Sequence, residues 1–277
     1  MKQLLFVLIL GLAAYLLYAS LPIFYVPNEK TEYLTIIGNK GAQKIAPENT
    51  MASFKTAESL GAGGIMLQVQ QTSDEKIIVL DYPQLNRTTS ASGFVKSQTW
   101  ENLQTHSAGI MFSDDYRYEP IPTLEEVLSS IPTDIKIIIE LNENDEYYPN
   151  FYENIASIIE TSGSKERVEV VSFKNSILKG FHEAAPTIHT GKIMYLKFPF
   201  TNIIYDTTPH TEELTFIDSV YIYYNFARKD LIEEYKNNDK NVYIWGANEL
   251  QLLYKFSYSG IDGIVTDHPE EYLRGNV

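Results

Sequence analysis

The chain has 277 residues, 44% of them hydrophobic and 21% charged, so it can bury a sizeable core, and its size suits one α/β barrel or two small domains. Its formal net charge of −14 excludes nucleic acid as a partner and disfavours broad contact with anionic lipid head groups. The absence of cysteine excludes disulfides, thiolate metal sites and a cysteine nucleophile.

The N-terminal segment is long and uncharged. Residues 3–28 contain no charged side chain, and residues 4–18 are almost purely aliphatic. Such a segment is long enough to cross a hydrocarbon layer of ~30 Å. We therefore expect residues 1–30 to form a single-pass membrane anchor with a short linker. A cleaved signal peptide is the alternative, although bulky residues precede the expected cut. The charge of Lys2 places the rest of the chain outside the cytoplasm by the positive-inside rule.

Beyond the anchor the sequence alternates between strand and helix signals. Short β-branched and apolar runs predict strands buried on both faces, at residues 34–39, 64–70, 76–81, 136–141, 167–173, 192–196, 219–224, 242–245 and 263–266. Amphipathic segments between them predict helices, at residues 51–60, 123–130, 151–161, 176–185, 229–237 and 250–258. Two segments without periodicity predict long loops, at residues 90–119 and 198–218.

This alternation predicts an α/β fold, a TIM (β/α)8 barrel over residues 31–277. Because such a barrel needs eight strands, one of the nine predicted strands is expected to be peripheral. A doubly wound open sheet is the alternative, but no glycine-rich dinucleotide turn follows an early strand. Functional side chains are expected at the carboxyl ends of the barrel strands, where active sites of this fold lie.

Several motifs, in order along the chain, carry a family resemblance. They are Ala46-Pro47-Glu48-Asn49-Thr50, Gly61–Ile65, Leu85–Thr89, Ile121–Glu126, Ile139–Leu141, Ser172-Phe173, Trp245 with Asn248, and Gly260–Pro269. Over residues 36–273 the sequence resembles the glycerophosphodiester phosphodiesterase family, whose members are phospholipase C-like TIM barrels. The resemblance implies cleavage of a phosphodiester of glycerol phosphate by two histidines. It also implies a calcium or magnesium ion held by three carboxylates, and an arginine and a lysine that bind the phosphate.

The positions that correspond to this machinery are mostly replaced. The first histidine and the arginine that follows it correspond to Asn39 and Lys40, and the second histidine corresponds to Asp81. Two of the three metal-binding carboxylates correspond to Met66 and Gln68. An amide cannot transfer a proton near neutral pH, and a thioether is a poor ligand for a hard cation. The resemblance therefore implies that no catalytic residue is intact.

Glu140 is the one retained residue of this set, and the family's lysine two positions later is Asn142. A single carboxylate is not sufficient to hold a metal ion, so we expect no cofactor. Two histidines in the predicted loops, His106 and His210, could fold over the barrel mouth and replace the lost acid or base. The other histidines are expected to be structural.

We expect a ligand-binding pocket at the barrel mouth, lined by Lys40, Gln68, Asp81, Glu140, Asn142 and Trp245. Asp81 is expected to hydrogen-bond Lys40 or a loop amide, and a weak metal-binding pair of Asp81 with Glu140 is the alternative. A salt bridge between Lys40 and Glu140 is a further expectation. Trp245 either stacks on a glycerol or sugar ring or packs inside the barrel.

The sequence thus predicts a membrane-anchored, catalytically inactive homologue that binds a phosphodiester, a polymer or a protein partner. The first alternative is an active phosphoric diester hydrolase that releases glycerol phosphate with non-standard residues. The second is a structural or assembly role, in which side chains fill the pocket.

Overall fold

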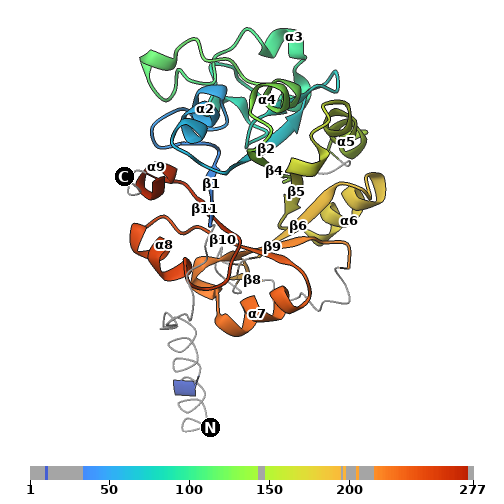
Figure 1. Ribbon diagram of the computed structural model, residues 1–277. Helices are drawn as coiled ribbons and strands as arrows, with labels where there is room; N and C mark the ends of the chain where they lie inside the picture. Colours follow the sequence, from blue (N-terminus) through green and yellow to red (C-terminus); the bar gives the residue numbers. More distant parts are fainter. Residues whose placement is uncertain are drawn as a thin grey trace.

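Eight parallel strands close into a barrel in the computed structural model of the chain (Figure 1). The structure describes residues 10–11, 34–142, 147–194, 196–197, 204–205 and 215–273. Around the barrel the strands are β1 (Thr35–Asn39), β2 (Gly64–Gln71), β4 (Lys136–Glu140), β5 (Val168–Ser172), β6 (His189–Met194), β9 (Ser219–Tyr223), β10 (Asn241–Trp245) and β11 (Gly263–Thr266). The barrel is closed because β1 pairs with both β2 and β11. The predicted fold class is confirmed.

Of the nine predicted strands, the one at residues 76–81 is the peripheral one. It forms β3 (Ile77–Val79), which pairs antiparallel with the end of β2 and with no other barrel strand. The antiparallel hairpin carries the chain beyond the rim of the barrel, and Asp81 follows directly after it. β3 therefore positions one of the predicted site residues from outside the parallel sheet.

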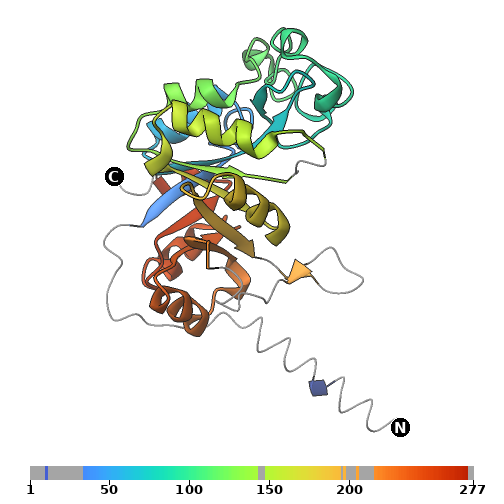
Figure 2. The same cartoon turned by 90° about the vertical axis from the view of Figure 1, so that its right-hand side faces the viewer.

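Helices surround the barrel and cover the outer faces of its strands (Figures 1 and 2). They are α2 (Met51–Ser59), α3 (Trp100–Leu103), α4 (Leu124–Ser130), α5 (Phe151–Thr161), α6 (Asn175–Ala184), α7 (Lys229–Asn237), α8 (Leu250–Phe256) and α9 (Pro269–Leu273). The N-terminus of α2 is capped by Thr50, whose side chain accepts a hydrogen bond from the Ser53 amide. At α4, Thr123 and Glu126 form a capping box.

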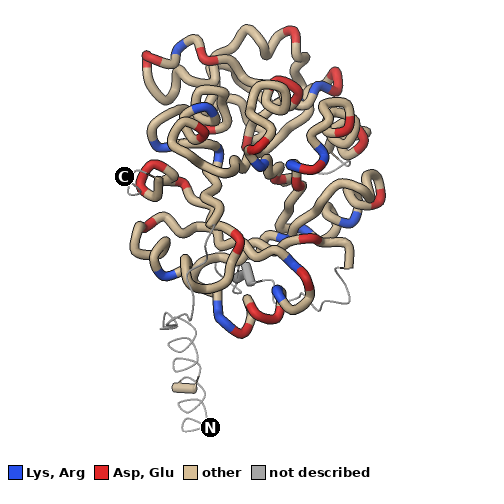
Figure 3. Tube along the Cα trace, viewed as in Figure 1, with Lys and Arg blue, Asp and Glu red and all other residues tan. Residues whose placement is uncertain are grey.

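The apolar residues form layers on either side of the strands. Inside the barrel lie Ile37, Met66, Ile138, Val171, Ile193, Tyr221, Tyr243 and Val265. Between strands and helices lie two larger clusters, which contain most of the buried isoleucines and valines. Charged residues are distributed over the helices and loops on all sides rather than gathered on one face (Figure 3). Because apolar layers lie both inside the barrel and beneath the helices, each barrel strand needs apolar side chains on both of its faces.

The amino-terminal end of the barrel is closed by a polar network. Glu169 on β5 is almost fully buried, and its carboxylate lies 2.5 Å from the Lys136 ammonium. Tyr221 and Ser219 both donate hydrogen bonds to Glu169, and Lys136 also donates to the Tyr243 hydroxyl at 2.9 Å. Burial alone would lower the pKa of Lys136, but the Glu169 carboxylate raises that pKa above its ordinary value. We call these residues the floor network.

The floor network depends on Gly191 in β6. A Cβ atom at Gly191 would lie 2.6 Å from the Glu169 carboxylate and 2.6 Å from the Ser219 hydroxyl, so a side chain there would displace both. β6 begins at His189, earlier than the predicted start at residue 192. The reason is that residues 189–191 pair with β5 and β9 although they form no apolar run.

The segment from 80 to 121 is irregular, as expected, but it is packed. It contains α3 and the 3-10 turns at Leu85–Arg87, Val95–Ser97 and Asp114–Tyr116. Its buried residues form a separate small core with β3, composed of Ile78, Leu80, Leu85, Ala91, Val95, Leu103, Ala108 and Ile121. This segment forms the upper part of the molecule in Figure 1. The remaining short elements are the 3-10 turns Lys165–Arg167 and Tyr224–Phe226 and the strand pair β7 (Leu196–Lys197) and β8 (Ile204–Tyr205).

Within the described part of the chain, no helix has both the length and the apolar character needed to cross a membrane. Apart from residues 10–11, the expected anchor at residues 1–30 lies outside the described residues, as do most of the predicted loop at 198–218 and His210.

Candidate functional site

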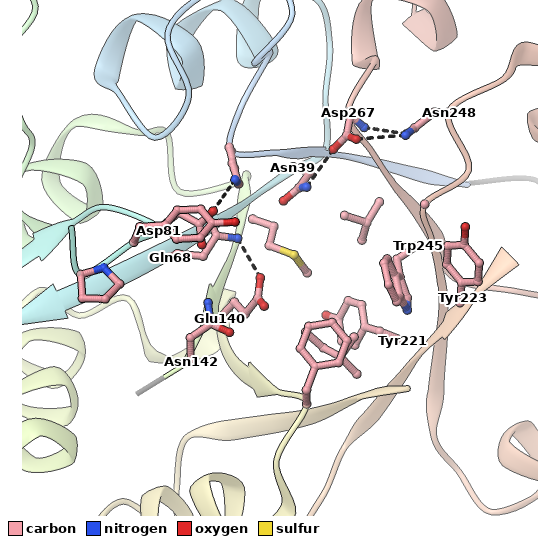
Figure 4. A pocket seen from close by; sticks show the side chains of 18 residues that line it. Asn39, Gln68, Asp81, Glu140, Asn142, Tyr221, Tyr223, Trp245, Asn248 and Asp267 are labelled. Carbon is pink, nitrogen blue, oxygen red and sulfur yellow. Dashed lines mark hydrogen bonds and ion pairs between the residues drawn. The ribbon is translucent and has the colours of Figure 1, made fainter. Parts of the chain in front are cut away.

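A pocket of about 590 Å³ opens at the carboxyl ends of the barrel strands. The residues predicted to form the site all line it: Asn39, Lys40, Gln68, Asp81, Glu140, Asn142 and Trp245. Polar side chains stand on one side of the pocket and aromatic rings on the other (Figure 4). The volume lies within the range typical of small-molecule sites. It counts against the structural alternative, in which side chains fill the pocket.

Lys40 is held in an unusual backbone conformation at the end of β1. Its φ of 57° lies in the left-handed region, which costs a non-glycine residue about 1 kcal/mol. The neighbouring backbone holds it there, because Lys40 N donates to Met66 O at 2.7 Å and Ser53 Oγ donates to Lys40 O at 2.8 Å. Gly41 follows with a φ of 80°, and a Cβ there would lie 2.5 Å from Ser53 Oγ. This strained turn directs the Lys40 side chain into the pocket mouth.

Lys40 is neutralised by acidic neighbours. Its ammonium lies 2.5 Å from Asp81 and 3.3 Å from Glu48, and both carboxylates also lie within 3.6 Å of the Arg87 guanidinium. Burial alone would lower the pKa of Lys40, but the Asp81 and Glu48 carboxylates raise it above the ordinary value. Arg87 in turn stacks on the Tyr82 ring, 3.8 Å from its centroid. The hydrogen bond between Asp81 and Lys40 agrees with the expectation for Asp81.

The possible salt bridge between Lys40 and Glu140 is not formed within the described part of the chain, where Lys40 pairs with Asp81 and Glu48. Glu140 instead accepts a hydrogen bond of 2.8 Å from Gln68 Nε2, and Gln68 Oε1 accepts one of 2.9 Å from Asn49. Gln68 and Glu140 stand opposite each other in the parallel pairing of β2 and β4, which explains why they meet. Asp81 and Glu140 have no hydrogen bond to each other within the described chain, so they do not form a carboxylate pair.

The residues at the family's metal position do not fit a divalent ion. Glu140 is the only carboxylate of that set, and its neighbours on β2 are the Met66 thioether and the Gln68 amide. Gln68 is already hydrogen-bonded on both its oxygen and its nitrogen. No group of three His, Asp or Glu side chains with metal-binding geometry is present over the ranges that the structure describes. A hydrogen-bonded chain of two amides and one carboxyl group takes the place of a metal centre.

Glu140 is the titratable group of this chain. Burial raises its pKa to about 7, and the nearby Asp81 carboxylate contributes in the same direction. The hydrogen bond from Gln68 and the charge of Lys40 oppose the rise without cancelling it. Near neutral pH the group therefore exchanges between a neutral and an ionised form.

This shift predicts how stability depends on pH. The folded chain keeps the Glu140 proton up to about pH 7, whereas a glutamate with the ordinary pKa of 4.5 has already released it. The unfolded chain thus binds fewer protons in this window, and the free energy of unfolding should fall as the pH rises from 4.5 to 7. Glu140→Gln should remove this contribution and make the protein more stable than wild type at pH 8, by at most about 3 kcal/mol.

Urea unfolding of wild type and Glu140→Gln between pH 5 and pH 8 measures the difference. The gap should narrow toward pH 5, because the folded chain is then protonated at Glu140 and the unfolded chain, with an ordinary pKa of 4.5, begins to bind the same proton. Parallel stability curves for the two proteins would contradict the shifted pKa. Glu153→Gln, on the exposed face of α5, is a matched control for the loss of one carboxylate.

Sequence reasoning missed Asp267, which follows β11 and lines the pocket. It accepts hydrogen bonds from Asn39 Nδ2 at 2.8 Å, Gln43 Nε2 at 2.6 Å and Asn248 Nδ2 at 3.0 Å. Asn248 Oδ1 also accepts a bond from the Asp267 amide. Asn39 thus serves as a hydrogen-bond donor to Asp267, and its own Oδ1 is buried with no hydrogen-bond partner among the residues that the structure describes. The position of Asp267 directly after the last strand was the signal that could have identified it.

Aromatic rings form the opposite wall. Trp245 lines the pocket and donates a hydrogen bond to Met194 O at 3.0 Å. Its ring packs at 4.7 Å from Tyr223 and at 5.6 Å, edge to face, from Phe173. Tyr221 lies deeper and is fully buried. Trp245 therefore packs at the top of the barrel, as one of the two expectations has it, and it also faces the pocket (Figure 4).

None of the histidines within the described ranges lines this pocket. His106 contacts Ser90 in the upper segment, His182 stacks on Phe216, and His189 and His268 lie near Asp218 and Glu270. Replacement of the lost acid and base by His106 is therefore not supported by the geometry. Glu140, whose pKa burial raises to about 7, is the pocket residue that can exchange a proton near neutral pH.

Comparison with known proteins identifies the family of the chain. The sequence profile described as the glycerophosphoryl diester phosphodiesterase family matches residues 40–271. A glycerophosphodiester phosphodiesterase of Caldanaerobacter subterraneus is 32% identical over 241 residues, which cover 86% of this chain and 96% of the relative.

Two solved structures share the fold. A glycerophosphodiester phosphodiesterase from Agrobacterium tumefaciens superposes with a TM-score of 0.75 at 22% identity, covering 87% of this chain and 99% of the other. A phosphodiesterase from Oleispira antarctica, in complex with the product sn-glycerol-3-phosphate, superposes with a TM-score of 0.76 at 20% identity, covering 87% and 96%.

Proposed function

This chain belongs to the glycerophosphoryl diester phosphodiesterase family, and we propose that it is a catalytically inactive member that binds a ligand in the barrel mouth without cleaving it. The observation that carries the proposal is the hydrogen-bonded chain from Asn49 through Gln68 to Glu140, which occupies the place of a metal centre. The pocket itself is retained, with a volume suited to a small molecule.

The replaced proton-transfer groups make hydrolysis slow. A positioned general acid or base contributes about 10²–10⁴-fold to a rate, and the positions of both are occupied by Asn39 and Asp81. Asn39 cannot titrate, and Asp81 is held in ion pairs with Lys40 and Arg87. Without a metal ion, the developing charge of a phosphodiester transition state would also lack its main stabilising group.

The ligand is expected to contain a glycerol or sugar moiety, alone or as part of a polymer. Support comes from the Oleispira antarctica relative, whose structure holds sn-glycerol-3-phosphate in a barrel of the same fold. The pocket of this chain offers carboxyl and amide groups on one wall and the Trp245 ring on the other. Such a mixed lining suits a hydroxylated molecule.

The proposal predicts that the full-length protein, purified in a mild detergent, releases no sn-glycerol-3-phosphate from a glycerophosphodiester in the presence of Ca²⁺ or Mg²⁺. Its rate should lie at least about 10⁴-fold below that of an active relative, because two proton-transfer groups are missing. A coupled enzymatic assay for glycerol phosphate measures the release, with the Caldanaerobacter relative as the positive control. Metal-dependent turnover that disappears in Glu140→Ala would instead support the alternative, an active hydrolase with non-standard residues.

We further propose that residues 1–30 anchor the protein in a membrane with the barrel on the extracytoplasmic side. Support comes from the uncharged residues 3–28 and from the charge of Lys2 before them. The protein should then stay in the membrane fraction after an alkaline carbonate wash, and protease added to intact protoplasts should digest the barrel. Release by carbonate, or protection in protoplasts that are digested after lysis, would contradict the proposal.

A further inference from the structure

Acidic groups outnumber basic groups in the pocket. Asp81, Glu140 and Asp267 line it, and Lys40 is the single lysine or arginine among its described lining residues. Lys40 is already paired with Asp81 and Glu48. Even when Glu140 is protonated, the lining therefore carries a net negative charge. An anionic ligand would be desolvated next to like charges, which costs several kcal/mol.

The nitrogen donors of the polar wall are also engaged. Gln68 Nε2 donates to Glu140, and the side-chain amides of Asn39 and Asn248 donate to Asp267. A phosphate group presents only acceptor oxygens and needs free, preferably charged, donors. The Lys40 ammonium and one N–H of each of these amides are directed at the protein's own carboxylates, so a phosphate would find few charged donors available to hold it.

The groups that remain available suit hydroxyl groups. Carboxylate oxygens accept more than one hydrogen bond each, and Asp81 and Glu140 both face the pocket. Asn142, on the same wall, offers a donor and an acceptor. A hydroxyl can donate to the carboxylates and accept from the amide. The C–H face of a sugar ring packs well against an aromatic surface such as that of Trp245 on the opposite wall (Figure 4).

From this inventory we infer that the pocket binds a neutral polyhydroxylated ligand, a sugar or polyol, and discriminates against its phosphorylated counterpart. The inference rests on the proposed function, because it specifies the ligand of the same pocket. It differs from the phosphate-binding chemistry that the resemblance implies. The Lys40–Asp81 pair is the element that sets this preference, since it neutralises Lys40, the one lysine or arginine among the described lining residues.

The test compares matched ligands that differ by one phosphate. Glucose with glucose 6-phosphate, and glycerol with sn-glycerol-3-phosphate, are titrated into full-length protein kept in a detergent without a sugar head group. The chain has two tryptophans, so Trp100→Phe, in the upper segment, leaves Trp245 as the sole tryptophan reporter of the pocket. The neutral member of each pair should quench or shift Trp245 fluorescence saturably, with an affinity at least about tenfold above its phosphate, a difference of 1.4 kcal/mol.

Asp81→Asn supplies a gain-of-function test. It keeps the shape of the side chain but removes one carboxylate from Lys40, so the ratio of phosphate to neutral affinity should rise at least about tenfold. Asp230→Asn changes the net charge equally in an exposed ion pair with Arg228 and should leave the ratio unchanged. The wild-type comparison stands by itself if Asp81→Asn does not fold.

Each outcome decides the inference. Phosphates that bind wild type as tightly as neutral ligands, or tighter, overturn it. The absence of saturable binding by all four ligands overturns it as well. An unchanged ratio in folded Asp81→Asn overturns the assigned role of the ion pair. All of these results leave the absence of hydrolysis untouched, whereas turnover of a glycerophosphodiester would overturn the proposed function itself.

Discussion

Glu169→Ala should lower the free energy of unfolding by about 2–4 kcal/mol, because it removes the acceptor at the centre of the floor network. The Lys136 ammonium would keep only the Tyr243 hydroxyl, and the Tyr221 hydroxyl would lose its carboxylate partner. Breaking a fully buried ion pair costs about 3–5 kcal/mol, and the estimate is reduced because 26% of the Lys136 side chain is exposed and can hydrate. Urea unfolding at pH 7 measures the loss.

Glu183→Ala is the matched control for this prediction. Glu183 lies on α6, where its side chain is 67% exposed and 3.8 Å from Lys179. Removing an exposed pair of this kind changes stability by less than about 1 kcal/mol. Glu169→Gln keeps the size and one acceptor oxygen, so it should fall between the two variants. A loss for Glu169→Ala no larger than that for Glu183→Ala would show that the floor network does not stabilise the barrel.

Met66→Glu combined with Gln68→Asp should create a calcium site that the wild-type protein lacks. Residues 66 and 68 point to the same face of β2, and Glu140 stands directly across from residue 68. Three carboxylates would then converge on one point. Without metal their repulsion should make the variant less stable than wild type. With about 10 mM Ca²⁺ the free energy of unfolding should recover by about 1–3 kcal/mol, as expected for a site with a dissociation constant of about 10⁻⁴–10⁻³ M.

Calorimetric titration and thermal unfolding with and without Ca²⁺ test this prediction. Wild type should show neither heat of binding nor a calcium-dependent midpoint, since Gln68 and Met66 provide no carboxylate. Adding Glu140→Gln to the double variant removes the third carboxylate and should abolish the effect. Calcium binding by wild type with similar affinity would contradict the conclusion that these positions do not fit a divalent ion.

Much of the fold follows from the order of hydrophobic runs. In β4, residues 137–139 are all isoleucine and fully buried. This strand could be predicted because a short continuous run of β-branched residues is typical of a parallel strand buried on both faces. β6 was predicted to start too late because His189, Thr190 and Gly191 are not apolar. A glycine is needed at position 191 because the Glu169 side chain, from another strand, occupies the space that a Cβ atom would fill. The sequence around Gly191 does not show this requirement.

The same limit applies to the site. The positions of Lys40, Gln68 and Glu140 were predictable, because the ends of parallel strands meet at one face of a barrel. Their partners were not all predictable. Glu140 pairs with Gln68 rather than Lys40 because of the register between β2 and β4, and Lys40 turns to Asp81 because of the hairpin at β3. Such choices depend on side-chain packing over long separations in sequence.

The hydrogen bond between Asn39 and Asp267 also has a consequence for folding. It joins residues 228 positions apart across the pairing of β1 with β11, the contact that closes the barrel. Contacts of such separation form late, because the intervening chain must already be ordered before they offset the loss of entropy. The pocket therefore forms only when the pairing of β1 with β11 closes the barrel. A partly folded chain has no binding site, so any ligand of the pocket stabilises the whole barrel by mass action.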